Sequence, residues 1–560
     1  MPLPPSGNTP WPPPRLEIPC ADMNMWRAWY SGNTDHLAAV YGGPANYRAN
    51  PIARQFFEAD KRHTSGGDEL RTFWGQEATP GQQTAKLHVP IAADIAEMSA
   101  NLLWSDVPQV SVDGDSTDAA TAKSTQAQIG RYLDDRGHAK MREASELTAG
   151  LSNVYLRVVW DTALRPRPWL DVIQPEAVVP TWRWGALAEA IVWRELAPLT
   201  DATKVWRLLE CHTPGFIEYG LYEGGVGELG MRADSLTAHP DSEGLAKRAD
   251  VHGRQATQID RLLIAHLPNV LPNRVWDGIP GMAPLGRSDF AGVEPLMDSL
   301  DEAWTSWMRD LRLGKARLLI PQSMLDTDGP GSGGSFNLER EVRVALNMLD
   351  EGGAGKDSIS EVQFKIRVEE HEMTTKALRL QILSSAGYSA QGFGEAGTVA
   401  ATATEVVARK EESLTTRGTK LLYQRPTLLE VLTTMMMVDV KHCGAKDVDP
   451  AAELTASWPQ AVQPDPEAVA RTLSLLDAAG AISTFMKVKW RSPELDDADV
   501  MAEVRRIRDD KESMSPAGDP FGARPDPNAE QDPQEGIDPE AGVDEGQDVG
   551  QDGKPGLKAA

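Results

Sequence analysis

The segment 292–314 carries the most regular apolar pattern in the chain. Its apolar side chains recur at intervals of three and four residues, which places them on one face of a single helix. They are Val293, Leu296, Met297, Leu300, Trp304, Trp307, Met308 and Leu311. The last turn is basic, because Arg309 and Arg312 face only Asp310 as a nearby acid. The pattern predicts one amphipathic helix that ends in positive charge.

A fixed order of elements follows this helix. A small β-like insertion (316–321, 342–348 and 362–368, around a loop at 328–335) leads to a second helix at 369–386. A connection with four glycines (387–397) then precedes a helical run at 399–440, which would span ~63 Å if unbroken. Gly418 and Pro426 predict a kink in that run. Such an order of elements is typical of a protein that functions by assembling into a larger structure.

Before residue 292, the spacing of the apolar residues changes at Gly150. Residues 22–150 read as mainly helical, with an apolar face at Ile91, Ile95, Met98, Leu102 and Leu103. After Gly150 the sequence predicts an antiparallel β-rich part with strands at 154–160, 169–173, 178–184, 190–195, 205–211, 216–222 and 262–267. Near the other end, short helices are expected at 466–479 and 499–510.

The two ends differ from the rest in composition. Eight prolines lie in the first twenty residues, and residues 514–560 hold eleven acidic and three basic side chains. The latter segment reads as a disordered acidic tail and accounts for −8 of the net charge of −26. No apolar run approaches the ~20 residues of a membrane span, and no signal peptide is visible. The three cysteines are far apart, which argues against disulfides and zinc and for a reducing compartment.

Motifs for catalysis fail on inspection. The segment 352–358 resembles a phosphate-binding loop, but Asp350 and Asp357 stand where glycine and a hydroxyl are needed. His371 and Glu372 lack the second histidine of a zinc motif, so a solvated pair near a helix start is the better interpretation. His88, His212 and His266 read as core or edge histidines, and the acidic pairs 369–370 and 496–497 as solvated faces. We therefore predict no enzyme, no metal and no cofactor.

Two stretches carry a resemblance to a known family. They are Pro284-Leu285-Gly286-Arg287-Ser288-Asp289-Phe290 continued by Glu294-Pro295-Leu296-Met297-Asp298-Ser299-Leu300-Asp301, and Ile382-Leu383-Ser384-Ser385-Ala386-Gly387-Tyr388-Ser389. With the order of elements, they make the chain resemble tailed-bacteriophage portal proteins of the SPP1 type, especially those of actinobacterial phages. The resemblance covers most of 25–510, by element order more than by identity.

The resemblance implies a fold and a domain plan. The fold class is α+β, mainly helical, with a wing, a two-helix stem, a small β-containing clip, a long kinked helix and a helical crown. The implied parts are a Pro-rich N-terminal arm (1–24), the wing (25–291), a stem helix (292–314), the clip (315–367), the second stem helix (368–387), the tunnel loop (388–398), the long wing helix (399–440), the crown (441–513) and the acidic tail (514–560).

The resemblance also implies a function without catalysis. Portal subunits form a homo-oligomeric ring, usually a dodecamer, at one capsid vertex, with a channel for double-stranded DNA during packaging and ejection. The implied partners are the large terminase, the major capsid and scaffold proteins, and a head-completion adaptor, with no membrane. The implied location is the virion, and the host cytoplasm during assembly.

Candidate functional residues follow by position. In the tunnel loop, Phe393 or Gln391 would touch the duplex while Glu395 repels phosphate. A basic band in the stem and clip contains Arg309, Arg312, Lys315, Arg317, Lys365, Arg367, Lys376 and Arg379. It would contact phosphates without regard to sequence, or pair between subunits, with Arg309 or Arg379 meeting Asp298, Asp301 or Glu369. We favour pairing, since a conduit that bound DNA strongly would stall it.

Two alternatives from other classes stay open. One is a metal-dependent hydrolase or nuclease without a visible motif, and the other is a helical scaffold or adaptor unrelated to phages. The net charge of −26 excludes a conventional DNA-binding protein. It is compatible with a protein through which DNA passes.

Overall fold

The chain is an α+β protein that divides into two compact units, Met1–Gln463 and Pro464–Ala560. The computed structural model describes residues 3–42, 73–76, 86–112, 118–199, 203–313, 317–319, 326–327, 334–335, 360–362, 367–393, 403–459, 466–492 and 497–514. The phosphate-loop-like segment 352–358, the expected strand at 342–348 and nearly all of the expected tail lie outside these residues.

The described residues between 17 and 151 of the first unit are mainly helical, as the sequence predicts. The helices are α1 (Glu17–Ser31), α2 (Thr34–Gly42), α5 (Ile91–Trp104), α6 (Ala119–Tyr132) and α7 (His138–Leu151), with a π-helical turn at Leu133–Gly137 between the last two. The apolar face expected on α5 is confirmed: Ile91, Ile95 and Leu103 are buried, and Met98 and Leu102 are half-buried. This face packs α5 against α1 and α7.

Antiparallel strands follow, and all seven expected strands are present. The main sheet has the order β1-β9-β8-β7-β6-β5, and β10 also pairs with β8; a second sheet has the order β11-β3-β4. The bounds are β3 (Asn153–Val159), β4 (Trp169–Ile173), β5 (Val178–Arg183), β6 (Ala186–Leu196), β7 (Val205–Thr213), β8 (Phe216–Gly224), β9 (Glu228–Arg232), β10 (Arg254–Ala256) and β11 (Ile264–Pro268). The small helix α8 (Pro240–Ala246) lies between β9 and β10 in the chain.

The described part of the Pro-rich N-terminal segment is integrated into the main sheet. Its strand β1 (Gly7–Pro10) pairs with β9, and the Trp11 amide donates to the Gly227 carbonyl at 2.8 Å. Leu3 and Trp11 are both 5% exposed. Proline lacks an N–H and is confined to edge strands, which is the position β1 occupies. The described residues of this N-terminal segment are thus part of the fold.

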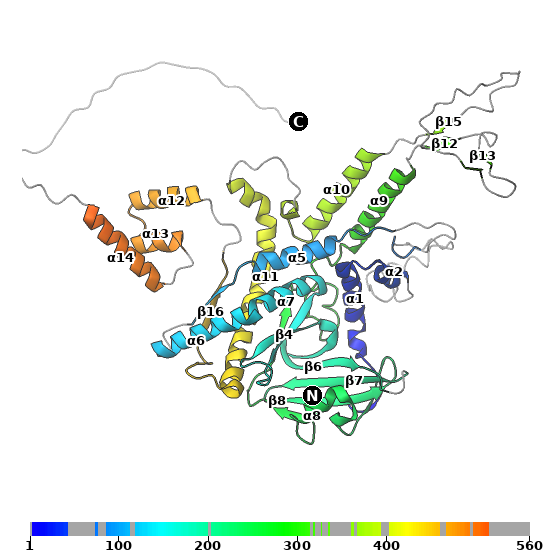
Figure 1. Ribbon diagram of the computed structural model, residues 1–560, viewed down its shortest axis with the longest axis horizontal. Helices are drawn as coiled ribbons and strands as arrows, with labels where there is room; N and C mark the ends of the chain where they lie inside the picture. The colour runs from blue at the N-terminus through cyan, green and yellow to red at the C-terminus, as the bar shows by residue number, and fades with distance from the viewer. Residues whose placement is uncertain are drawn as a thin grey trace, which may run out of the picture. The chain divides into compact units, whose positions relative to one another are not determined.

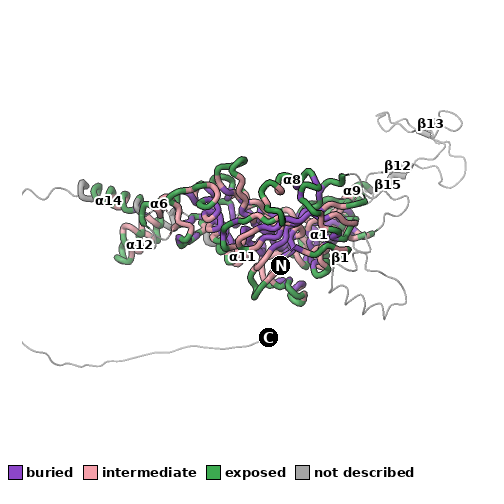
Figure 2. Tube along the Cα trace, turned by 90° about the horizontal axis from the view of Figure 1, so that it is seen from below, coloured by how far each residue is buried: buried purple, intermediate pink, exposed green. Residues whose placement is uncertain are grey.

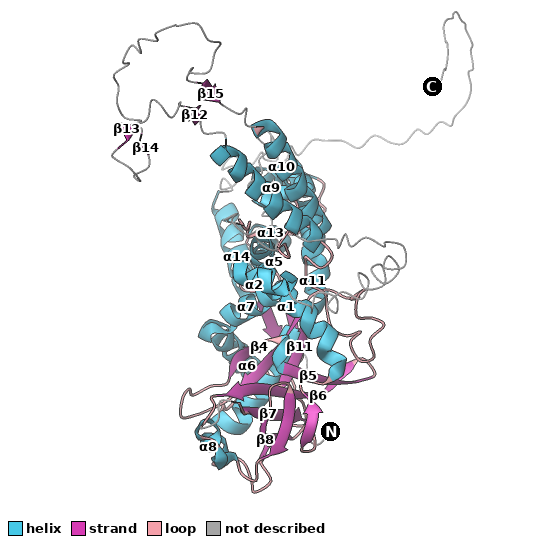
Figure 3. Ribbon diagram, turned by 90° about the vertical axis from the view of Figure 1, so that its right-hand side faces the viewer, coloured by secondary structure: helices cyan, strands magenta, loops and turns pink. Residues whose placement is uncertain are grey.

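The two helices of the expected stem are α9 (Glu294–Leu313) and α10 (Val368–Ser385), which lie side by side (Figures 1 and 3). Between them, β12 (Arg317–Leu319) pairs with β15 (Ser360–Val362), and β13 (Asp326–Thr327) pairs with β14 (Gly334–Ser335). After α10, a short 3-10 helix at Ala390–Phe393 precedes the long helix α11 (Ala403–Val438). Helix α11 continues through both Gly418 and Pro426, where the sequence predicts a kink.

Two large apolar clusters form the core of the first unit, and Figure 2 shows where the buried residues gather. One joins α6, α7 and the sheets to the last turns of α11, through residues such as Leu428 and Met435. The other joins α1 and α5 to one end of the α9–α10 pair, through Met297, Leu300 and Ile382. A π-helical turn (Asp439–Cys443) follows α11, and β16 (Leu454–Ser457) then pairs with β2 (Gln109–Val112).

The second unit contains α12 (Pro466–Ala478), α13 (Thr484–Arg491) and α14 (Asp497–Met514). Two of these helices match the expected ones, whereas α13 was not predicted. The Ser483 hydroxyl accepts a hydrogen bond from the Met486 amide at 3.2 Å and so caps the start of α13.

Two histidines of the β-rich part lie where the sequence predicts them. His212 is 2% exposed, and burial lowers the pKa of His266 to about 3, as expected for core or edge histidines. Cys20, Cys211 and Cys443 are all free thiols. No described helix is both long and apolar enough to cross a bilayer.

Candidate functional site

The α9–α10 pair is buried at one end and exposed at the other. Up to Thr305, α9 buries five side chains, those of Met297, Asp298, Leu300, Asp301 and Thr305, whereas no residue from 306 to 312 is buried. In α10 the order is reversed, since Ile382 and Leu383 near its end are fully buried and residues 368–370 at its start are exposed. We call these the base and the far end of the pair.

At the base, polar side chains of α9 hold a segment from another part of the chain. The Asp298 carboxylate accepts the amides of Phe73 and Trp74, at 2.8 and 3.2 Å. The Asp301 carboxylate accepts the Trp74 indole N–H at 3.0 Å and the Val89 amide at 2.8 Å.

Asp301 also contacts a histidine. The His88 Nδ1 lies 2.8 Å from the Asp301 carboxylate, and the two side chains are 6% and 1% exposed. One turn further on, the Thr305 hydroxyl accepts the Leu87 amide at 3.0 Å. Spacings of three and four residues put Asp298, Asp301 and Thr305 on one face of α9. That face therefore fixes residues 73–74 and 87–89 to the base.

These contacts correct one expectation. Asp298 and Asp301 were expected to meet arginines of a neighbouring subunit, but they are 8% and 1% exposed and are occupied within their own chain. The expectation failed because only the apolar stripe of α9 was assigned to the buried side, whereas the aspartates lie next to that stripe. Of the three acids proposed for intersubunit pairing, Glu369 is the exposed one.

The far end is charged and open to solvent. Asp310 accepts from Arg367 at 3.2 Å and from the His371 ring at 2.9 Å, and these bonds, chiefly that from His371, lower the pKa of the carboxyl group. The His371 ring also stacks on Trp307, with ring planes 6° apart. His371 is therefore engaged and half-buried, and the expectation of a solvated histidine there is wrong.

The basic band is brought together only in part. Arg309, Arg312, Arg367 and Lys376 are exposed, and Arg379 is half-buried. Burial raises the pKa of the Asp94 carboxyl of α5, and the charge of nearby Arg379 offsets part of that rise. Lys315, Lys365 and the side chain of Arg317 lie outside the described residues. The far end thus presents exposed positive charge on both helices.

The connection after α10 starts in a buried position. Gly387 has a φ of 83°, and Tyr388 is 1% exposed. The Phe393 ring is half-buried and meets the Tyr388 ring edge to face, with centroids 6.5 Å apart. Gln391 is also half-buried, while Glu395 lies outside the described residues. Of the three residues expected to face DNA, two therefore rest partly against their own chain.

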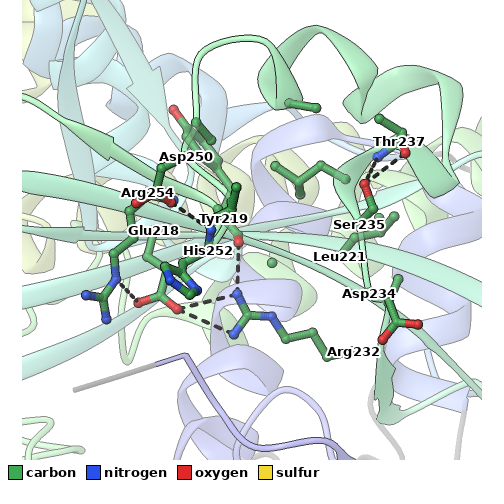
Figure 4. A pocket seen from close by; sticks show the side chains of 17 residues that line it. Glu218, Tyr219, Leu221, Arg232, Asp234, Ser235, Thr237, Asp250, His252 and Arg254 are labelled. Carbon is green, nitrogen blue, oxygen red and sulfur yellow. Dashed lines mark hydrogen bonds and ion pairs between the residues drawn. The ribbon is translucent and has the colours of Figure 1, made fainter.

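A polar hollow beside β8 is not a convincing ligand site (Figure 4). Its buried carboxylate, Glu218, lies 3.4 Å from both Arg232 and Arg254. Asp250 accepts the amides of His252 and Arg254 within its own turn. Glu218 is thus paired with two arginines of the lining, and Asp250 is engaged by its own turn. Among the described residues, no group of three or more His, Cys, Asp or Glu is placed to hold a metal ion.

Comparison with known proteins gives little further information. No family model and no curated protein sequence matches the chain. One similar solved structure is the neck of an empty GTA particle, computed with C6 symmetry. The two chains are 16% identical, and their alignment covers 73% of this chain and 91% of the neck chain, with a TM-score of 0.33. This score is too low to assign the two chains to one fold.

Proposed function

We propose that this chain is the portal subunit of a tailed phage, a non-catalytic protein that forms a ring around a channel for double-stranded DNA. The α9–α10 pair would line the channel as the stem, and residues 315–367 would form the clip that meets the terminase and later the head-completion adaptor. The observation that carries the proposal is the form of this pair: its base is buried in the core, and its far end is left exposed by the residues that the structure describes.

Apolar side chains on the pair support assembly. Met373 is 65% exposed, Val368 42%, Leu380 39% and Leu311 38%. Met373 and Leu380 are seven residues apart and so lie on one face of α10; an exposed apolar face of this kind is where we expect another copy to pack. In a ring, the neighbouring copy would cover that face.

The charges of the pair support the same role. Arg309, Arg312 and Lys376 are exposed on a chain whose net charge is −26. In a ring they would form bands of positive charge, while the acidic excess elsewhere would keep DNA from adhering. With Asp298 and Asp301 occupied internally, Glu369 is the acid of α10 that would pair with such an arginine across an interface.

Charge reversal tests this function. We expect Arg312→Glu with Lys376→Glu to reduce ring formation, because the bands pair between subunits, and to leave the fold of the monomer intact. The readouts are particle mass and negative-stain images at equal protein concentration. Lys123→Glu, an exposed lysine of α6, is the matched control and should form rings normally.

The outcomes separate the alternatives. Normal rings with altered DNA packaging would show that the band contacts DNA instead of neighbouring subunits. A compact monomer with a metal-dependent activity would favour the hydrolase or nuclease, and a monomer without one the unrelated scaffold or adaptor.

A further inference from the structure

A buried ion pair contacts the start of the connection that follows α10. The Lys420 ammonium of α11 and the Asp289 carboxylate are 2.5 Å apart, and their side chains are 3% and 4% exposed. Lys420 also donates to the Ser99 hydroxyl of α5 at 2.5 Å. The pair therefore joins α11 and α5 to the segment that leads into α9.

The connection is attached to the same carboxylate. The Tyr388 hydroxyl donates to the Asp289 Oδ2 at 2.7 Å, while the Asn269 amide donates to Oδ1 at 2.7 Å. Asp289 thus accepts bonds from three different parts of the chain.

Helix α11 holds the residues on either side of Tyr388 as well. The Thr416 hydroxyl donates to the Gly387 carbonyl at 2.6 Å, and the Ser389 amide donates to the Ser413 hydroxyl at 2.9 Å. Positions 413, 416 and 420 follow one face of a helix. At Gly387, a Cβ would approach the Thr416 hydroxyl to 2.7 Å, so the backbone is held close to α11. One face of α11 therefore fixes three successive residues. Thr416 holds Gly387, Ser413 holds Ser389, and Lys420 holds Tyr388 indirectly, because both bond to Asp289.

A buried ion pair is a weak source of stability, because the cost of removing both charges from water offsets their attraction. Breaking it by removing one partner is costly, since the other charge is left buried. Such a pair is better suited to fixing one arrangement of the elements it joins than to adding stability. Here the elements are α11, α5 and the start of the connection.

We propose that Lys420 and Asp289 are positioning residues that set where residues 387–393 leave the end of α10. Any effect of this positioning on a DNA channel rests on the proposed function, in which these residues form the first part of the tunnel loop. The attachment of the connection to α11 stands independently of that function.

Hydrogen–deuterium exchange of the full-length chain tests the attachment. In Lys420→Met with Asp289→Asn, the charges are removed together, so neither is left buried alone. We expect exchange of the amides 387–393 to rise by about tenfold, with exchange in the main sheet unchanged. Tyr388→Phe removes only the hydroxyl bond to Asp289 and should raise exchange there by about threefold. Thr427→Val, another buried polar residue of α11, is the matched control and should leave 387–393 unaffected.

Two results would overturn the inference. One is wild-type exchange at 387–393 in both variants. The other is an equal rise in the control, since that would reflect general loosening of α11. If the double variant fails to fold, Tyr388→Phe decides alone. A chain that shows the expected exchange but forms no ring would refute the portal function and leave the positioning role standing.

Discussion

Helix α9 carries two aspartates that each lie beside a histidine, in opposite environments. Asp301 lies at the base with His88, where the two side chains are 1% and 6% exposed. Asp310 lies at the far end with His371, where they are 28% and 13% exposed. Nine residues separate the aspartates, a rise of about 14 Å along the helix. The same chemistry therefore serves two purposes on one helix.

The difference shows which part of the pair is scaffold and which part is free to engage partners. Asp301 accepts three bonds from a distant segment, so it contributes to the fold. Asp310 accepts bonds from His371 of α10 and from Arg367 just before it, so it joins the far ends of the two helices; the described residues around it are largely exposed.

The largest effect is expected at the base. Asp301→Ala leaves the Trp74 indole, the His88 ring and the Val89 amide without their acceptor in a buried site. We expect a loss of about 3–5 kcal/mol in the free energy of unfolding, because each buried orphan donor costs about 1–3 kcal/mol. Calorimetric melting of the purified chain measures it.

Asp310→Ala is the matched control on the same helix and should cost less than about 1 kcal/mol, as exposed ion pairs do. Equal losses for the two variants would remove the contrast between the ends. If Asp301→Ala does not fold, Thr305→Val, which removes one bond at the same base, should still cost more than Asp310→Ala.

An intermediate effect is expected from pH at the base. Asp22 is a buried residue of α1, and its carboxylate accepts the Trp276 indole N–H at 2.8 Å. Burial raises the pKa of Asp22 to about 7, against this hydrogen bond, and the charge of Glu294 at the start of α9 raises it further. The unfolded carboxyl loses its proton near 3.8, so unfolding releases a proton in this window and stability falls as the pH rises through it. We therefore expect the free energy of unfolding of Asp22→Asn to increase relative to that of the wild type as the pH rises toward about 7, by up to a few kcal/mol.

The readout is the difference in melting temperature between the two chains across that range. A difference that does not grow between pH 4 and about pH 7 would contradict the raised pKa of Asp22. Asparagine can still accept from Trp276, so the hydrogen bond at this position is retained in the variant.

The smallest effect, with the opposite sign, is expected at the far end. The bonds from His371 and Arg367 lower the pKa of Asp310 below its ordinary 3.8. The stability this provides is present above pH 3.8 and is lost as the pH falls through the lowered pKa. We expect a small advantage of the wild type over Asp310→Asn that vanishes in acid and shrinks in high salt. An advantage that persists in acid would mean that Asp310 acts through packing.

Local pattern was sufficient to predict most elements. The apolar stripe of α9 and the β-branched runs after Gly150 depend on neighbours within a few residues, so the helices and strands were predicted near their observed bounds. Strand β1 was missed, because eight prolines in twenty residues read as an irregular arm.

The polar contacts could not be predicted in this way. Asp301 meets residues more than 200 positions away, and Lys420 meets Asp289 across 131 positions. The residues around Asp301 do not indicate that an aspartate beside an apolar stripe is buried. Nor do the residues around Lys420 indicate which lysine of a long helix pairs with a buried carboxylate. Both depend on how distant segments pack.

Single-particle electron microscopy of the purified full-length chain tests the portal proposal most directly. The account predicts rings with a central opening, with the α9–α10 pairs side by side around it. A chain that stays a compact monomer at every concentration examined, or that assembles with these helices facing outward, would contradict it.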